Sequence, residues 1–409
     1  MKPTRHQFTV LKQICDLVPP HLVSKLAVEH GVEEKTRSFT PWSHTVALMF
    51  AQVSHALSLN DVCDTLDNHS GVLTTVRHAS PPSRNGFSNA NRERNADMAE
   101  ALFWKTLEDL QGRFPLFGMG RRYVGFPRRF RKRVINVIDS TTIKLVANCM
   151  DWAKHRRRKA AAKCHMRLNL ETFLPSFAVV KSANSHDAKE ARGVCAGIKA
   201  GEIVVFDKAY VDFAHLGELD DRGVFWVSRA KTNMQYEVVR EHSPAGGNIR
   251  RDVVVRLTGN RAGKAYANGL RLVTADVEVN GKMIALTFIT NNFSWAASSV
   301  GDLYKARWGI EVFFKQIKQT LQLGDFLGHN ENAVRWQIWT ALLVYVLLRF
   351  IAYMGKWTHS FARLFTVLRG TLWECLDLFK LLDRYGTASP PPRCCAAPEQ
   401  AYLPGLRLC

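Results

Sequence analysis

The chain has 409 residues, of which 46% are hydrophobic and 22% charged, an ordinary composition for a folded protein of two or three domains. Its net charge of +20 is unusual and points to a polyanionic partner, with nucleic acid first, an anionic membrane surface second and a basic surface kept for solubility third. Nine cysteines without a CxxC pair or zinc-ligand spacing argue against a structural zinc site and favour a reducing compartment.

Two segments bear on membranes. Residues 1–20 lack the continuous apolar core and small-residue cleavage site of a secretory signal. Residues 338–354 form the most apolar run, which is short for a membrane span and contains Arg349. We therefore expect a buried core helix at 338–354, and a cytoplasmic protein with no membrane partner.

Residues 1–113 are expected to form an all-helical N-terminal domain. Pro41 opens a strong helical pattern, a second follows Ser58, and a third covers residues 96–110. A helical domain of this size could bind the ends of a DNA element, and it could equally serve only to pack against the rest of the chain.

Residues 114–133 are expected to form a basic linker. Seven Lys or Arg residues lie between 121 and 133, interleaved with Tyr123, Phe126 and Phe130. The basic side chains could neutralise DNA phosphates, and the aromatic rings could stack on bases or anchor the segment on the core. The candidates for phosphate contacts are Arg128, Arg129 and Arg131, and a solvated linker is the alternative.

From residue 134 the pattern changes to strands. Four segments are apolar or alternate as strands do: 134–143, 165–172, 177–184 and 203–212. The first and last of these are apolar runs that end in Asp139 and Asp207. Such runs, followed by helical segments, indicate a sheet covered on both faces. Active sites collect at the carboxyl edge of an open sheet, so we expect the two carboxylates to lie there together.

The remainder of the chain divides into three parts. Residues 231–300 are rich in strands and Gly turns, which predicts a separate β-rich insertion. Helical patterns resume at residue 301 and continue to about Leu382. Residues 356–409 are therefore expected to form a helical C-terminal region that ends in a loose tail containing Pro and Cys.

Residues 303–321 predict a helix with two distinct faces. At about 100° per residue, one stripe carries the polar side chains Tyr304, Arg307, Glu311 and Lys318. The adjacent stripe is apolar and carries Leu303, Ile310, Phe314, Ile317 and Leu321. The apolar stripe should be buried, which leaves the polar stripe at the edge of the core. Taken alone, this stripe is better explained by a solvated face with i,i+4 ion pairs.

Together with Asp139 and Asp207, Glu311 is a candidate metal ligand. Three carboxylates at one place would repel each other unless a cation joined them. Hard oxygen ligands without soft donors suit Mg²⁺ or Mn²⁺. A pair of such ions can activate water or a 3′-hydroxyl and stabilise the leaving oxygen of a phosphodiester.

These motifs resemble those of DDE transposases of bacterial insertion sequences, in the insertion-sequence-four branch marked by a Tyr–Arg–Glu–Lys signature. The signature spacing of Tyr, two residues, Arg, three residues, Glu, six residues and Lys is met by Tyr304, Arg307, Glu311 and Lys318. The first family motif matches Asp139-Ser140-Thr141, and the second, Asp-x-Gly-x-Tyr, matches Asp207 to Tyr210 with Ala209 in place of Gly. The resemblance runs from about residue 134 to 325 and extends to the helical N-terminus.

The resemblance implies an α/β fold. An RNase H-like catalytic core, a mixed sheet with flanking helices, would comprise residues 134–230 and 301–355. The β-rich insertion 231–300 would interrupt it, and the all-helical domain 1–113 would precede it. Asp139, Asp207 and Glu311 would be the catalytic residues and the ligands of two Mg²⁺ or Mn²⁺ ions.

The resemblance also implies DNA contacts. Tyr304, Arg307 and Lys318 would grip the DNA end, with Arg supplying a bidentate fork and Lys a point charge. Arg229 and Lys231 match a basic pair near the catalytic strands, although structural pairing explains them as well. His186 and Asp187 follow the third strand, where a solvent-exposed turn is the plainer interpretation.

The implied activity is metal-dependent cleavage at insertion-sequence ends and strand transfer into target DNA, by cut-and-paste transposition that could pass through a hairpin. The partners would be double-stranded DNA, both terminal inverted repeats and target, bound by a homodimer on paired ends in the bacterial nucleoid. Two alternatives stay open: an RNase H-fold nuclease that hydrolyses DNA without joining it, and a non-catalytic DNA-binding derivative of a transposase.

Overall fold

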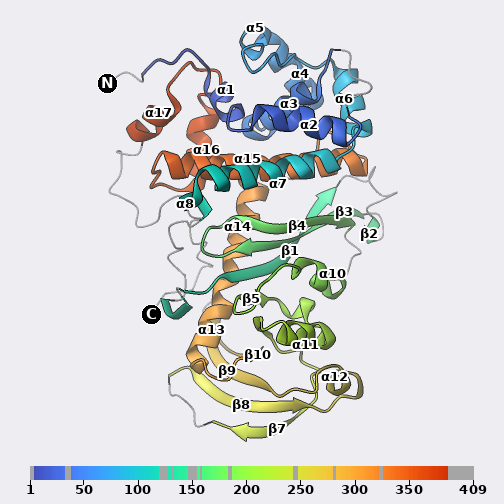
Figure 1. Cartoon of the computed structure of the whole chain (residues 1–409), viewed down its shortest axis with the longest axis vertical. Coiled ribbons are helices and arrows are strands. Elements are labelled where there is room, and N and C mark those ends of the chain that lie inside the picture. The colour runs from blue at the N-terminus through green and yellow to red at the C-terminus, as the bar shows by residue number, and fades with distance from the viewer. Residues whose placement is uncertain are drawn as a thin grey trace. The chain divides into compact units, whose positions relative to one another are not determined.

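The computed structural model describes residues 4–32, 38–118, 128–130, 132–145, 154–156, 159–182, 187–242, 247–279, 282–321 and 326–385 (Figure 1). They form two compact units. Unit 1 holds the described residues within Met1–Gly120, Ile143–Ala162 and Phe314–Glu399, and unit 2 those within Arg121–Thr142 and Lys163–Phe313. Residues 314–355, which we expected in the catalytic core, therefore group with the N-terminal helices.

Unit 1 is built mainly of helices. They are α1 (Val10–Cys15), α2 (Pro20–Glu29), α3 (Pro41–Ser54), α4 (Leu59–Asn68), α5 (Ser70–Leu73), α6 (Arg84–Glu93), α7 (Asp97–Arg113), α8 (Pro115–Gly118), α15 (Glu331–Met354), α16 (Phe361–Arg369) and α17 (Leu378–Tyr385). Three predicted helices are confirmed as α3, α4 and α7. Their starts follow local chemistry, since Thr40 caps α3 and Ser58 forms a reciprocal capping box with Asp61 at α4.

Helix α15 lies at the centre of unit 1, in contact with α3, α6, α7 and α16. It is the one helix among the described residues that is long and apolar enough to cross a membrane, and 83% of its most apolar window is buried inside the protein. The prediction of a buried core helix at 338–354 is therefore confirmed.

Most of unit 2 is a mixed sheet. Its strands are β1 (Ile135–Leu145), β2 (Lys154–Arg156), β3 (Lys159–Asn169), β4 (Pro175–Ser182), β5 (Ile203–Phe206), β6 (Phe225–Arg229), β7 (Tyr236–Glu241), β8 (Ile249–Leu257), β9 (Leu270–Val279) and β10 (Lys282–Thr290). The order is β2-β3-β1-β5-β6-β10-β9-β8-β7, with β4 paired to β3. Strand β5 is parallel to β1 and to β6. The pairs β6 with β10, β10 with β9, and β9 with β8 are antiparallel. Strand β2 and the first residues of β3 belong to unit 1.

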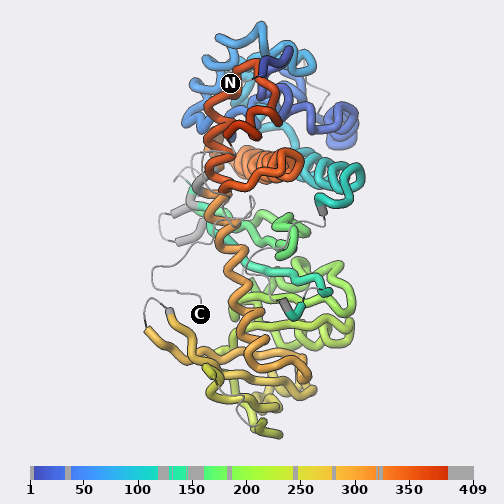
Figure 2. Tube along the Cα trace, turned by 90° about the vertical axis from the view of Figure 1, so that its left-hand side faces the viewer, coloured from blue at the N-terminus to red at the C-terminus, as the bar shows by residue number. Residues whose placement is uncertain are grey.

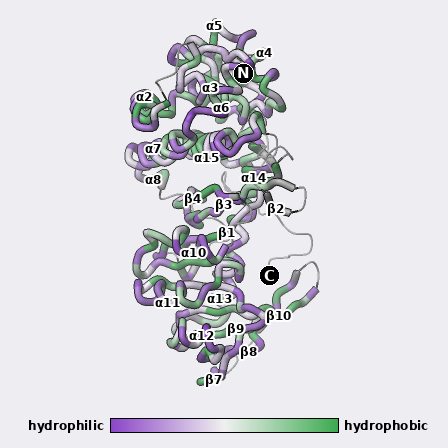
Figure 3. The backbone as a smooth tube through the Cα atoms, turned by 90° about the vertical axis from the view of Figure 1, so that its right-hand side faces the viewer, coloured by the Kyte–Doolittle hydropathy of each residue, from purple (hydrophilic) through white to green (hydrophobic). Residues whose placement is uncertain are grey.

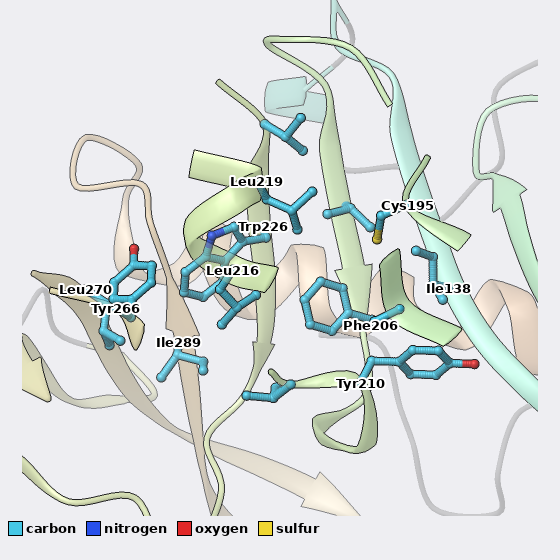
Figure 4. Packing of buried hydrophobic residues seen from close by; sticks show 14 of the residues in the cluster. Ile138, Cys195, Phe206, Tyr210, Leu216, Leu219, Trp226, Tyr266, Leu270 and Ile289 are labelled. Atoms are coloured by element: carbon cyan, nitrogen blue, oxygen red, sulfur yellow. The ribbon is translucent and has the colours of Figure 1, made fainter. Parts of the chain in front are cut away.

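Helices cover both faces of the central strands, as the apolar runs predicted. One face of β5 and β6, with Val204, Phe206 and Trp226, packs in one buried cluster with Leu216 and Leu219 of α11 (Figure 4). The helices on this side are α10 (Asp187–Val194), α11 (Phe213–Asp221) and the short α12 (Asn260–Ala265). Hydrophilic and hydrophobic stretches alternate along α11 (Figure 3), as expected of a helix with one buried side.

The other face of the central strands meets α13 (Ala297–Ala306), which contacts β5, β6, β9 and β10. All four residues of β5 are buried, which requires cover on both faces because side chains alternate along a strand. Figure 2 shows the chain of α13 and the first residues of α14 (Trp308–Thr320) running on the side of the sheet away from α10 and α11.

The strands of residues 231–300 do not form a separate sheet. Strand β10 pairs with β6 through Phe288 and Arg229, Ile289 and Ser228, and Thr290 and Val227. Strands β9, β8 and β7 then extend the same sheet outward. The strand content of the predicted insertion is therefore confirmed, but its separation from the core sheet is wrong, because the pairing of β10 with β6 makes one continuous hydrogen-bonded ladder.

The predicted helix 303–321 is interrupted at Arg307. Helix α13 ends at Ala306 and α14 begins at Trp308. The amide of Arg307 donates to the carbonyl of Tyr304, and the amide of Ile310 donates to the carbonyl of Arg307, both over three residues. This tighter turn keeps the chain in the helical region at Arg307 and joins the two helices without a loop.

Candidate active site

Asp139 and Asp207 lie level with each other on neighbouring parallel strands. Asp207 directly follows β5, and its Oδ1 accepts from the amide of Ala209 at 3.1 Å, which caps the short 3₁₀ helix η3 (Lys208–Tyr210). The prediction that Asp139 ends its strand is wrong, because β1 continues to Leu145. The pairing of β1 with β5 nevertheless stops at Ile138 and Phe206, so both carboxylates begin where this ladder ends.

The pleat of β1 determines which way Asp139 faces. Ile138 belongs to the buried cluster on the α11 side of the sheet. Successive side chains of a strand point to opposite faces, so Asp139 faces the side of α13 and α14. The signature residues approach from that side.

Three signature residues contact the two aspartates or each other. Arg307 donates from Nη1 to Asp139 Oδ2 at 2.7 Å and from Nη2 to Glu311 Oε1 at 2.6 Å. The Tyr304 hydroxyl donates to Asp207 Oδ2 at 3.3 Å. The structure thus brings Asp139, Asp207 and Glu311 to one place, linked by Tyr304 and Arg307.

Burial and charge oppose each other at this place. Burial raises the pKa of Asp139 to about 6; Arg307 counteracts this effect, while Glu311 and Asp207 add to it. Burial lowers the pKa of Arg307, but Asp139, Tyr304 and Glu311 outweigh burial and raise it above its usual value. Arg307 therefore stays charged, and it offsets part of the repulsion among the carboxylates. The side chain of Glu311 is 50% exposed, which leaves this ligand candidate open to solvent.

The donor chemistry fits a divalent cation. The converging groups are carboxylate oxygens, the ligands that Mg²⁺ and Mn²⁺ prefer. Among the described residues, no group of three or more His, Cys, Asp or Glu side chains is spaced so that it could hold a metal ion in this structure. The guanidinium of Arg307 pairs with both Asp139 and Glu311.

The other predicted DNA contacts differ in their surroundings. Lys318 lies on α14, seven residues beyond Glu311, in the part of the helix that belongs to unit 1. Lys231 donates from Nζ to the carbonyl of Val211 at 2.7 Å, as the structural alternative predicted. Arg229 ends β6 and lies close enough to Tyr304 to lower the pKa of its hydroxyl, although burial dominates and raises that pKa to about 12.

The basic segment is anchored at one aromatic residue. Arg128, Arg129 and Phe130 form a 3₁₀ turn, and Phe130 is buried against the ring of Trp295 with centroids 5.0 Å apart. Arg129 is exposed and donates from Nη1 to the hydroxyl of Ser299 at 2.8 Å. Arg131 lies outside the described residues. Of the two roles considered for the aromatic rings, anchoring on the core is the one observed for Phe130.

The sequence indicated a solvent-exposed turn at Asp187, but the structure places this residue elsewhere. Its side chain is 15% exposed, and it accepts hydrogen bonds from Ser140 and Lys163. Lys163 and His165 gave no signal in the sequence, because they lie in the middle of the alternating strand β3. Only the adjacency of Ser140 to Asp139 could have pointed to this group. His186 lies outside the described residues.

Comparison with known proteins shows the family. The family described as a transposase DDE domain matches residues 130–347, more than half of the chain, and a domain of unknown function, DUF4372, matches residues 6–76. The protein y4zB of Sinorhizobium fredii, assigned as a transposase, is 32% identical over 65% of this chain and 72% of its own length. A Geobacillus stearothermophilus protein, assigned as the transposase of insertion sequence element IS5377, is 29% identical over 56% of this chain and 59% of its own length.

Two further similarities extend this comparison. The transposase InsG of insertion sequence element IS4 from Escherichia coli is 29% identical over 36% of this chain and 34% of its own length. Among solved structures, the piggyBac transposase synaptic complex with hairpin DNA aligns with a TM-score of 0.44 and 10% identity, over 92% of this chain and 80% of that chain. The resemblance inferred from the Tyr–Arg–Glu–Lys signature is confirmed, and the chain belongs to the transposase DDE domain family.

Proposed function

We propose that the chain cuts DNA at the ends of an insertion sequence and joins those ends to target DNA, using an RNase H-like core. The strand order β4-β3-β1-β5-β6, with β1, β5 and β6 parallel, is the order expected of such a core. The observation that carries the function is the contact of Arg307 with Asp139 and Glu311. Together with the contact of Tyr304 with Asp207, it gathers three carboxylates around one signature.

In this proposal Asp139, Asp207 and Glu311 hold two Mg²⁺ or Mn²⁺ ions. Ions bound there would activate water or a DNA 3′-hydroxyl and stabilise the leaving oxygen. Tyr304 orients Asp207 through its hydroxyl. Arg307 offsets the negative charge of the ligands, and its planar fork suits both carboxylates and phosphate.

The remaining cations are assigned to DNA. Lys318 and Arg229 contact phosphates near the cleaved end, and Arg128, Arg129 and Arg131 contact the DNA backbone without reading its sequence. The helical residues 1–113 hold the terminal inverted repeats. Two ends must meet before they are joined, which implies a homodimer on paired DNA ends.

A strand-transfer assay tests this proposal. A labelled duplex that carries a pre-cleaved terminal repeat is mixed with plasmid DNA, purified protein and Mg²⁺. Joined, labelled plasmid is the expected product, and it should vanish when the metal is chelated. Metal-dependent nicking without joining would instead identify a nuclease, and binding without any metal-dependent product would identify a DNA-binding derivative.

A further inference from the structure

A polar cluster lies behind Asp139, on the opposite face of β1. It consists of Ser140, Lys163, His165, Asp187 and Tyr210, which come from β1, β3, the start of α10 and η3. Ser140 follows Asp139 in the strand, so its side chain points to the α10 side while Asp139 points to the α13 and α14 side. All five residues belong to unit 2.

Asp187 is the centre of this cluster. Its Oδ1 accepts from the Ser140 hydroxyl at 2.8 Å, and its Oδ2 accepts from Lys163 Nζ at 2.9 Å. His165 Nδ1 lies 3.4 Å from the same carboxylate and 2.9 Å from the Tyr210 hydroxyl. His165 therefore lies between Asp187 and Tyr210, and the negative charge of Asp187 adds to the rise in the pKa of Tyr210 that burial causes.

The cluster is mostly buried. His165 is fully buried, Tyr210 is 2% exposed, and the side chains of Lys163 and Asp187 are each 15% exposed. A carboxylate removed from water is costly unless it is paired and hydrogen-bonded, and Asp187 meets both conditions. Contacts of this kind fix side chains in one arrangement, because breaking any of them leaves a buried polar group unpaired.

The cluster joins the two aspartate motifs. Ser140 is the neighbour of Asp139, and Tyr210 lies three residues after Asp207 on the turn that Asp207 caps. This connection occurs where the ladder between β1 and β5 has ended at Ile138 and Phe206. Beyond that point, no pairing with β5 holds β1 in register. Tyr210 extends toward β1 from the apolar cluster (Figure 4).

We infer that Asp187 is a positioning residue that sets the separation of Asp139 and Asp207 for cation binding. It acts through Ser140 on one motif and, by way of His165, through Tyr210 on the other, from the face of the sheet opposite to the ligands. Lys163 supplies the charge that keeps the buried carboxylate in place. This inference rests on the proposed role of Asp139 and Asp207 as metal ligands.

The test measures Mn²⁺ binding to the full chain by calorimetry, with thermal melting and DNA affinity measured on the same samples. Asp187→Ala should weaken Mn²⁺ binding by about 10- to 100-fold, the usual effect of losing a group that orients metal ligands. DNA affinity in the absence of metal should be unchanged. Asp187→Asn, which keeps an oxygen acceptor for Ser140 but loses the charge that pairs with Lys163, should give a smaller loss.

Arg192→Ala is the matched control. Arg192 lies on the same helix, α10, and forms an exposed ion pair with Glu218. Its loss should leave Mn²⁺ affinity at the parental value. If Asp187→Ala lowers the melting temperature but binds Mn²⁺ as tightly as Arg192→Ala does, the inference is overturned and Asp187 is only structural.

Two more variants test the inference if Asp187→Ala does not fold or if the metal site itself is absent. Should Asp187→Ala fail to fold, Ser140→Ala removes only the hydroxyl that joins Asp187 to the first motif. Parental Mn²⁺ affinity in a folded Ser140→Ala protein would also overturn the inference. Asp139→Ala distinguishes failure of the positioning role of Asp187 from failure of the proposed metal site. If the parent binds Mn²⁺ no better than Asp139→Ala does, the proposed metal site itself is wrong.

Discussion

Arg307 donates from Nη1 to Asp139 Oδ2 at 2.7 Å, across two elements that are far apart in the sequence. The same guanidinium reaches Glu311, so one planar group serves two carboxylates that would otherwise repel each other. The side chain of Arg307 is only 9% exposed and that of Asp139 is 18% exposed. Removing one partner of a pair this buried costs more than breaking a surface salt bridge, because the other charge is left buried and unpaired. The signature arginine therefore has a structural role within the site in addition to phosphate contact.

Loss of this pair should cost stability. Arg307→Ala leaves Asp139 buried without its counter-charge, which we expect to lower the free energy of unfolding by about 3 kcal/mol. Urea denaturation of parent and variant measures the change. Arg256→Ala removes an arginine whose ion pair with Glu237 is exposed, and it should leave the urea midpoint almost unchanged. An Arg307→Ala protein as stable as this control would show that the pair has no energetic role.

Cation binding should depend on pH through Asp139. Because burial raises the pKa of this carboxyl to about 6, a proton competes with the cation below that pH. Affinity for Mn²⁺ should fall about tenfold for each pH unit below this pKa and level off above it. Arg307→Ala should move the midpoint to higher pH, because Arg307 opposes the rise. Mn²⁺ titrations from about pH 5 to pH 8 test this, and an affinity that stays constant over this range would contradict it.

Lys318 should bind DNA without affecting the chemistry of cleavage. Lys318→Ala removes a positive charge from the signature stripe, and we expect binding of end DNA to weaken by about 1–3 kcal/mol. Gel-shift titration measures this loss, and cleavage at saturating DNA should keep the parental metal dependence. Lys305→Ala is the control, since Lys305 is an exposed lysine on α13 that lies off the stripe. Equal losses in both variants would show that only total charge matters.

The basic segment should contribute a salt-dependent, sequence-independent part of DNA binding. Replacing Arg128, Arg129 and Arg131 with Ala should flatten the plot of log affinity against log salt by up to about 0.9 per lost phosphate contact. The matched control replaces Arg250, Arg251 and Arg256 of β8, each of which forms an ion pair with an acidic side chain. An unchanged slope in the first triple variant would reduce the segment to a linker.

Local patterns were enough to predict much of this structure. The capped helices α3 and α4 and the buried helix α15 follow from spacing and capping residues, which act over a few positions. The signature found Tyr304, Arg307 and Glu311 for the same reason, since all three lie within eight consecutive residues. Strand β5 and the placement of Asp207 after it also follow from one short apolar run.

Features that depend on distant pairing were missed. The sequence near Asp139 does not indicate that β1 continues beyond the end of its partner β5. The sequence of residues 282–290 does not indicate that β10 pairs with β6. The break at Arg307 coincides with ion pairs to Asp139 and Glu311 that helical periodicity alone does not reveal. The cluster around Asp187 combines residues from four elements, so no single window of sequence contains it.

The central claim is that Asp139, Asp207 and Glu311 act together as ligands of the catalytic cations. The most direct measurement compares the parent with Asp139→Ala, Asp207→Ala and Glu311→Ala for binding and for Mg²⁺-dependent cleavage and joining of one labelled end DNA. Each variant removes a negative charge that faces a polyanion, so all three should bind the DNA as tightly as the parent or more tightly, while cleavage and joining are lost. If any of the three still cuts and joins the DNA at the parental rate in Mg²⁺, the three carboxylates do not form the catalytic site.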